Sequence, residues 1–178
     1  MTATKATATP AASKDAASKG IDPRGPRFGA AITAVLLIVV IALGLLGGNP
    51  ATLAERLVQP SFLLFAVISL VFAWGAFAGI QRHPYGVLFR NLVRPRLKPP
   101  VELEDPTPPT FAQGVGFVIT AVGIVLYLVG VPYAIVVAAA AAFVAAFLNS
   151  VFAYCLGCQI YLLLARAGVL GRKRPAAA

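Results

Sequence analysis

The residues of this chain whose type and spacing could do chemistry are its two cysteines, Cys155 and Cys158. In a helix, side chains three residues apart share a face, so the two sulfurs could alternate between dithiol and disulfide or carry a persulfide. Such a pair is activated at a helix amino terminus or beside positive charge. The surrounding run is apolar enough to be helix interior in lipid, which disfavours the thiolate. A helix break near Gly157, or arginines approaching from residues 81–110, would favour it again.

Three other interpretations of the cysteine pair remain open. Free cysteine is among the most buried residue types, so both side chains could serve only packing. A cysteine near the inner membrane interface could be palmitoylated. A closed zinc site needs four ligands, and the pair with the single histidine, His83, does not supply them. We therefore expect no metal and no cofactor, and the sequence leaves open whether the protein is an enzyme.

The composition places these cysteines in a membrane protein. Hydrophobic residues make up 59% of the chain and charged residues 12%, whereas soluble domains carry about 25% charged residues. About 20 apolar residues cross the ~30 Å hydrocarbon core as a helix. The sequence therefore predicts an all-α bundle of four transmembrane helices. The predicted spans, none of which contains Asp, Glu, Lys or Arg, cover about residues 28–47, 61–80, 111–131 and 133–165.

The fourth predicted span is longer than a membrane requires. Its uncharged run would be about 50 Å long as one helix, so the helix must tilt, break near Gly157, or lay its last turns along the interface. Asn149 and Ser150 within it are expected to bond across helices. A polar residue at membrane depth is also a candidate for a substrate path.

Local patterns mark helix starts and contacts. Thr52-x-x-Glu55 is a capping box that predicts a short helix between the first two spans, and Thr110-x-x-Gln113 is a second that predicts the start of the third span. Gly75 and Gly79 form a small-xxx-small pattern, which is typical of closely packed membrane helices.

The remaining segments are polar. Residues 1–21 lack large apolar side chains after Met1, so we expect a disordered tail before a membrane domain of residues 22–168, and residues 169–178 form a basic carboxyl-terminal tail. The loop of residues 81–110 is basic in its first half and acidic and proline-rich in its second. Residues 85–94 could form a basic amphipathic helix on the lipid headgroups.

The distribution of charge predicts the orientation. The net charge is +9, and every Lys and Arg except Arg56 lies in the two ends of the chain or in the 81–110 loop. By the positive-inside rule, both termini and this loop face the cytoplasm of a bacterial inner membrane. Thiols stay reduced in the cytoplasm, so no permanent disulfide is expected. We attribute the positive charge to topology and to attraction of anionic headgroups, and expect no nucleic acid partner.

The basic half of the loop is a candidate docking surface for anionic lipid headgroups or for a soluble partner. Candidate partners are a thioredoxin-like protein, a sulfurtransferase and a second copy of this chain. The docking residues are Arg82, Arg90, Arg94, Arg96 and Lys98.

Three motifs together resemble a known family. They are Asp22-Pro-Arg-Gly-Pro-Arg27-Phe28, Arg94-Pro-Arg-Leu followed by Glu104-Asp-Pro-Thr-Pro-Pro-Thr-Phe-Ala-Gln113, and Cys155-Leu-Gly-Cys158. Over residues 21–166 the chain resembles domain-of-unknown-function family 4395, a family of small actinobacterial membrane proteins. The resemblance implies a four-helix inner-membrane protein and carries no established activity.

Two hypotheses of function follow. In the first, the chain is a membrane thiol-redox or sulfur-handling protein in which Cys155 and Cys158 react and the basic loop docks a partner. In the second, it is a non-enzymatic membrane scaffold that uses the same loop, with structural cysteines.

Overall fold

The computed structural model describes residues 20–169 and confirms the predicted all-α class. Four of its α-helices are long and apolar enough to span a membrane, which indicates a multi-pass membrane protein. Residues 20–169 contain no β-strand. In this range, Ile21 and Glu104 form an isolated antiparallel β-bridge. The long helices are α2 (Arg24–Gly47), α4 (Pro60–Ala78), α6 (Thr107–Leu128) and α7 (Ala134–Phe152). The shorter α-helices are α3 (Leu53–Val58), α5 (Pro84–Leu88) and α8 (Leu156–Arg166).

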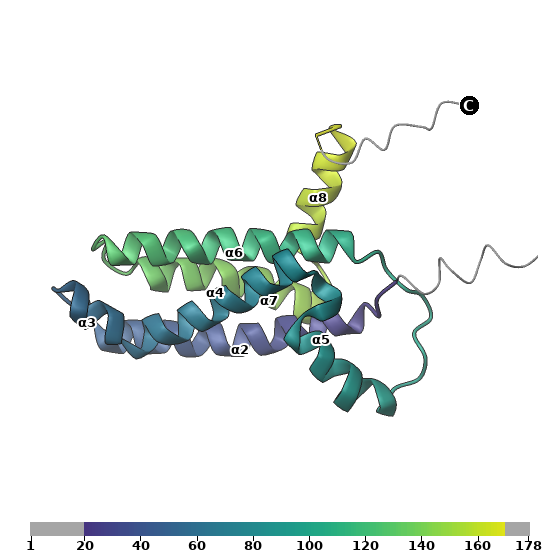
Figure 1. Ribbon diagram of the computed structural model, residues 1–178, viewed down its shortest axis with the longest axis horizontal. Helices are drawn as coiled ribbons and strands as arrows, with labels where there is room; N and C mark the ends of the chain where they lie inside the picture. Colours follow the sequence, from purple (N-terminus) through teal and green to yellow (C-terminus); the bar gives the residue numbers. More distant parts are fainter. Residues whose placement is uncertain (1–19, 170–178) are drawn as a thin grey trace, which may run out of the picture.

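The four long helices lie side by side in alternating directions (Figure 1). α2 packs on α4 and α7, and α6 packs on the same two helices, so each long helix has two long neighbours. The first described residues, α5 and α8 lie at one end of the assembly (Figure 1). We call this the loop end. α3 and the turn between α6 and α7 lie at the opposite end, the α3 end.

The centre of the assembly is apolar and closely packed. Leu37 and Val40 of α2, Phe65 of α4 and Ala139 of α7 are fully buried. One polar contact crosses this core, where the Thr120 hydroxyl lies 3.0 Å from the Ser69 hydroxyl. Many outward-facing apolar side chains of the long helices are exposed, as expected for surfaces that meet lipid rather than water.

Glycines permit close contacts between these helices. A Cβ at Gly75 would lie 2.7 Å from Gln113 Cγ, and a Cβ at Gly116 would lie 2.6 Å from the Phe72 ring. Gly75 therefore has the packing role that its spacing predicted. Gly79 does not, because it follows α4 with φ of +83° and a Cβ there would meet nothing within 4 Å. It ends the helix instead.

The α3 end is held by side chains that bond to backbone. Thr52 and Glu55 form both hydrogen bonds of the predicted capping box at the start of α3. Among residues 20–169, Arg56 is the one Lys or Arg at the α3 end of the assembly. Its side chain donates to the carbonyls of Pro50, Ala51 and Leu128. Because Leu128 is the last residue of α6, this cation also complements the negative end of that helix dipole.

The predicted capping box at Thr110 is wrong. Helix α6 begins three residues earlier, at Thr107, and the Thr110 hydroxyl donates to the carbonyl of Pro106 as a residue inside the helix. Asp105 holds the start of the helix instead, accepting from the backbone amide and the hydroxyl of Thr107. The prolines that follow fit because the first helical turn needs no backbone donors.

The basic loop folds back against α2 as a chain of short helices. η1 (Ile80–Arg82) precedes α5, and the π-turn η2 (Phe89–Val93) and the 3₁₀ turn η3 (Arg94–Arg96) follow it. The helical character predicted for residues 85–94 is therefore present. Phe89 packs on α2, whereas Val87, Leu88 and Leu92 remain exposed. Phe89 is only 3% exposed, and its ring lies tilted against that of Phe28, with ring centroids 5.8 Å apart.

Three hydrogen bonds tie the start of the described chain to this loop. Ile21, assigned from sequence to a disordered tail, exchanges two backbone hydrogen bonds of 2.9 Å with Glu104. Arg24 pairs with Asp22 at 2.7 Å and donates to the carbonyl of Lys98. The rest of the predicted amino-terminal tail, and residues 170–178 of the predicted basic tail, lie outside the described residues.

Candidate functional site

The fourth predicted span is broken just before the cysteines. α7 ends at Phe152, and Ala153 has the left-handed φ of 56° that commonly terminates a helix. The Tyr154 amide then donates to the Leu148 carbonyl and satisfies one free helix end. The long uncharged run of residues 133–165 therefore forms two helices. The break lies at residues 153–155, so the predicted alternative of a break near Gly157 is the one present.

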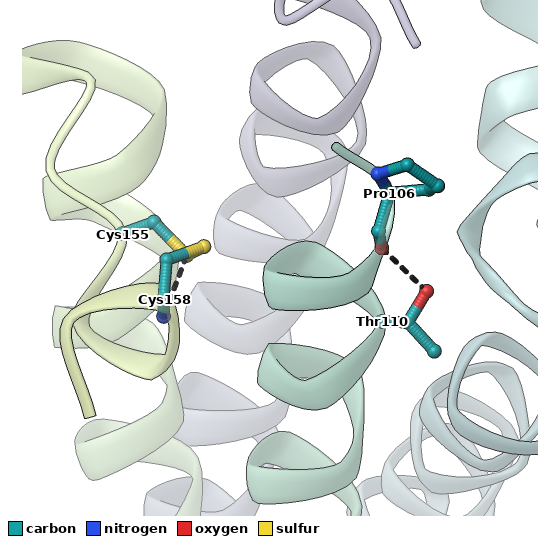
Figure 2. The surroundings of a disulfide bond; sticks show 4 residues. All are labelled: Pro106, Thr110, Cys155 and Cys158. Carbon is teal, nitrogen blue, oxygen red and sulfur yellow. Dashed lines mark hydrogen bonds between the residues drawn. A yellow bond between two sulfur atoms is a disulfide. The ribbon is translucent and has the colours of Figure 1, made fainter. Parts of the chain in front are cut away.

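Cys155 is the N-cap residue of α8. Its backbone is extended, and its sulfur accepts a hydrogen bond of 3.3 Å from the Cys158 amide in the first turn (Figure 2). The expectation that the pair lies inside a helix is therefore wrong, and the reason is the break after Phe152. A helix amino terminus stabilises negative charge, so this position favours a thiolate at Cys155.

The two cysteines are joined in a disulfide, with their Cα atoms 5.2 Å apart. Both residues are half-buried. The sequence analysis expected no permanent disulfide, and the structure shows that the first turn of α8 brings the two sulfurs within bonding distance. The arrangement combines a disulfide, an amide donor and partial access from outside, which are the elements of a thiol-exchange site.

Helix α8 is docked on the start of α6. A Cβ at Gly157 would lie 2.5 Å from the Cβ of Ala112, so only glycine permits this approach. The rings of Phe111 and Tyr161 lie 5.6 Å apart along the same contact. Figure 1 shows α8 pointing away from the long helices, across their direction. If the long helices cross the membrane, α8 therefore runs along its surface, as one of the predicted alternatives for this segment.

A groove of about 990 Å³ opens beside the disulfide. It runs from the cysteines and the basic loop at the loop end into the space between α2, α6 and α7. Its walls contain both cysteines, three arginines of the predicted docking surface and several polar side chains. These residues are Cys155, Cys158, Arg82, Arg90, Arg94, His83, Tyr85, Gln113 and Asn149.

The predicted docking residues divide into two groups. Arg82, Arg90 and Arg94 line the groove with the cysteines, whereas Arg96 and Lys98 do not. A smaller depression of about 410 Å³ is lined by Lys98 together with Arg90 and Arg94. All five side chains are exposed, and Arg90 also donates to the carbonyl of Gln81.

His83 has a structural role that the sequence analysis did not assign. It is 4% exposed, and its Nδ1 accepts from the Tyr85 amide as the cap of α5. Its ring lies 5.1 Å from that of Tyr85. Burial lowers the pKa of His83 from its usual value, an effect that the backbone of Val71 partly offsets. The histidine is therefore neutral at pH 7.

At the rim of the groove, Asp22 is held ionised by its neighbour. The hydrogen bond from the Arg24 side chain lowers the pKa of Asp22 below its ordinary value, and burial opposes this shift. Glu104 also lines the groove, together with Arg27, so the four arginines of the lining outnumber its two carboxylates.

The polar residues of α7 do not bond across helices as predicted. Ser150 donates to the Phe147 carbonyl of its own helix. Asn149 faces the groove, and within residues 20–169 its side chain forms no hydrogen bond. No cluster of three or more His, Cys, Asp and Glu residues able to hold a metal ion occurs in that same range.

Comparison with known proteins assigns the chain to a family. It matches the family described as Domain of unknown function (DUF4395) over residues 21–166. The match covers most of the chain, including α2 to α8 and both cysteines, so the protein belongs to this family. Neither the curated proteins nor the solved structures contain a match.

Proposed function

We propose that this protein is a membrane thiol-disulfide oxidoreductase in which Cys155 and Cys158 are the reacting pair. The observation that carries the proposal is the position of Cys155 at the N-cap of α8, with its sulfur accepting from the Cys158 amide. A cysteine used only for packing needs neither a helix terminus nor a partner within bonding distance.

The reaction follows ordinary thiol exchange. In the reduced protein, the Cys155 thiolate attacks one sulfur of a partner's disulfide, and the other partner sulfur leaves as a thiolate. The Cys158 thiolate then attacks Cys155 Sγ and releases the second partner sulfur. The dithiol is oxidised to the disulfide by loss of two electrons, and the partner's disulfide is reduced to a dithiol. Persulfide transfer to Cys155 would begin with the same attack on sulfur.

The charge pattern supports a cytoplasmic partner. The loop end carries the groove, the arginines and the cysteines, and the positive-inside rule directs this end to the cytoplasm of a bacterial inner membrane. A thioredoxin-like protein or a sulfurtransferase would approach the exposed Arg82, Arg90 and Arg94 and meet the disulfide beside them. Anionic lipid headgroups would bind the rest of this basic surface, including Arg96 and Lys98.

Trapping of a mixed disulfide tests the proposal. In Cys158→Ser the second attack is removed. A thioredoxin that keeps one active-site cysteine, activated as a mixed disulfide with thionitrobenzoate, should therefore bind Cys155 with release of thionitrobenzoate and run as a covalent adduct on a non-reducing gel. Cys155→Ser should give no adduct, because the N-cap thiolate is gone. Equal adducts from both variants, or none from either, would contradict the assigned roles.

The scaffold hypothesis is favoured by a separate observation, the exposure of all five basic loop residues. It predicts that Cys155→Ser and Cys158→Ser together leave partner binding and cellular function unchanged. The thiol proposal predicts that the double variant folds and binds but loses function.

A further inference from the structure

Small side chains line the deep part of the groove, between the membrane-spanning helices. From Ala153 at the end of α7, the lining extends along that helix to Ala141, which is about 18 Å at 1.5 Å per residue. The α7 wall consists of small side chains, among them Ala142, Ala145 and Ala146. Larger apolar side chains, Phe72 of α4 and Val115 and Ile119 of α6, line the other walls.

Two amides line the groove near its mouth, on the neighbouring helices α6 and α7. Gln113 lies in the second turn of α6 and Asn149 in the last turn of α7, and both line the groove. Across residues 20–169, neither side chain forms a hydrogen bond with the protein. Both residues are half-buried, and polar side chains without a protein partner inside a membrane domain are by default candidates for binding a ligand.

Neutral amides restrict the chemistry of that ligand. Each amide has both donors and an acceptor, and no Asp, Glu, Lys or Arg of the long helices beyond Arg27 lines the groove. The groove is thus suited to an uncharged molecule that places oxygen atoms at the two amides near the mouth and an apolar tail along the alanines of α7. A quinone has two carbonyl oxygens that accept from the amides, and its hydroquinone has two hydroxyls that donate to them.

We infer that the groove binds a prenylated quinone, which exchanges two electrons with the Cys155–Cys158 pair. This inference rests on the proposed function, because it supplies the second redox partner of the same disulfide. The dithiol gives two electrons and two protons to the quinone, and the products are the disulfide and the hydroquinone. The position of Cys155 at the amino terminus of α8 favours the thiolate form from which the electrons leave.

Reconstituted full-length protein provides the test. The protein is placed in nanodiscs of phosphatidylcholine, reduced with dithiothreitol, freed of reductant and mixed with decylubiquinone while quinone absorbance is followed. We expect one hydroquinone for each dithiol oxidised, and no hydroquinone from Cys155→Ser.

Variants of the two amides test the binding site. Replacing Gln113 and Asn149 together by Leu should weaken decylubiquinone binding about tenfold, since two modest hydrogen bonds are lost. Asn149→Gln keeps an amide in the site and should retain more of the affinity than Asn149→Leu. The matched control is Gln159→Leu, because Gln159 is an exposed amide next to Cys158 that does not line the groove. This variant should bind decylubiquinone with the affinity of the native protein.

Results that contradict the quinone site can be told apart from results that contradict the proposed thiol-disulfide function. Unchanged affinity in the double Leu variant, or displacement of decylubiquinone by anionic phosphatidylglycerol, would overturn the quinone site in favour of lipid in the groove. If the disulfide cycles with thioredoxin but the reduced protein forms no hydroquinone, the quinone inference fails while the proposed function stands. If the disulfide cycles with neither, both fail.

Discussion

The backbone on either side of Cys155 determines the environment of its sulfur. Ala153 in the left-handed region ends one helix, and the Cys158 amide in the next helix then points at the Cys155 sulfur. Cys158 lies one turn further along, where its side chain can reach the first sulfur but its own backbone is already helical. The two thiols are therefore chemically unequal, although the spacing in the sequence makes them look equivalent.

This inequality predicts different reactivity in the reduced protein. At pH 7, Cys158→Ser, which keeps only Cys155, should react with iodoacetamide about tenfold faster than Cys155→Ser. A helix amino terminus can stabilise a partly buried thiolate by about 1.4 kcal/mol, which corresponds to a tenfold larger thiolate fraction. The rates are measured by mass spectrometry of quenched samples. In detergent-unfolded chains the two variants should react alike, and a faster Cys158 in the folded protein would contradict the assignment.

His83 predicts a dependence of stability on pH. Because burial lowers its pKa in the folded protein, the unfolded chain binds a proton more readily than the folded one. Above about pH 6.5, His83 is neutral in both states and the free energy of unfolding does not depend on its titration. Below about pH 6.5, the free energy of unfolding falls by up to about 1.4 kcal/mol per pH unit. The thermal midpoint in detergent should therefore be lower at pH 5.5 than at pH 7.5.

The control for this effect is His83→Asn, since asparagine also caps helices but does not titrate. The difference between the midpoints at the two pH values should shrink in this variant. An undiminished difference would mean that another group is responsible.

At the scale of elements, α8 is the part whose position matters most. It carries the disulfide at one end and is held on α6 by the contact between Gly157 and Ala112. The contact places the cysteines at the mouth of the groove. Any change that separates α8 from α6 should therefore change access to the disulfide as well as stability.

Replacing Gly157 by Ala tests this contact. The added Cβ would overlap Ala112, which costs about 1–3 kcal/mol when neighbours must shift, so we expect a lower thermal midpoint and faster reduction of the disulfide by dithiothreitol. Gly114→Ala is the matched control, because a Cβ there would meet Ala76 at an ordinary 3.9 Å. Equal effects of the two substitutions would show that α8 is not held by this close approach.

Sequence patterns predicted some elements and missed others for identifiable reasons. Long uncharged runs predicted the four long helices, and the Thr52 capping box predicted α3, because both signals are local. The break before Cys155 has no such signal, since Ala153 and Tyr154 are neither glycine nor proline and cysteine is not a usual N-cap residue. A break near Gly157 is one of the predicted alternatives and is present at residues 153–155. The close contact of Gly157 itself with Ala112 could not be predicted, because it forms only in the folded chain.

The same distinction applies to the candidate site. The Cys-x-x-Cys spacing identified the pair from sequence, and the charge pattern identified the basic loop. That Arg82, Arg90 and Arg94 share a groove with the cysteines depends on how residues 79–106 fold back against α2, through contacts such as Phe89 with Gly25. These contacts are distant in sequence, so spacing could not predict them.

At the scale of the whole molecule, the two ends are different in charge and in structure. The α3 end carries Arg56, which is occupied with backbone carbonyls, whereas the loop end carries the exposed arginines, the groove and the disulfide. This asymmetry predicts that the loop end faces the cytoplasm. The orientation decides which redox partners the disulfide can meet.

Reporter fusions measure this orientation. Green fluorescent protein at the carboxyl terminus should fluoresce, and alkaline phosphatase at the same place should be inactive, because it folds only outside the cytoplasm. Alkaline phosphatase joined after Asn49, at the α3 end, should be active and serves as the control. An active phosphatase at the carboxyl terminus would invert the topology and place the cysteines in an oxidising compartment.

A redox titration of the disulfide tests the central claim most directly. Inverted membrane vesicles are equilibrated at pH 7 in thiol-disulfide buffers of known potential, and free thiols are then tagged with a maleimide that shifts the gel mobility. We predict one two-electron transition with a midpoint less negative than about −300 mV, above the range of structural disulfides, and tagging without detergent. A disulfide that stays oxidised below that potential, or thiols that can be tagged only after detergent is added, would contradict a redox role for Cys155 and Cys158.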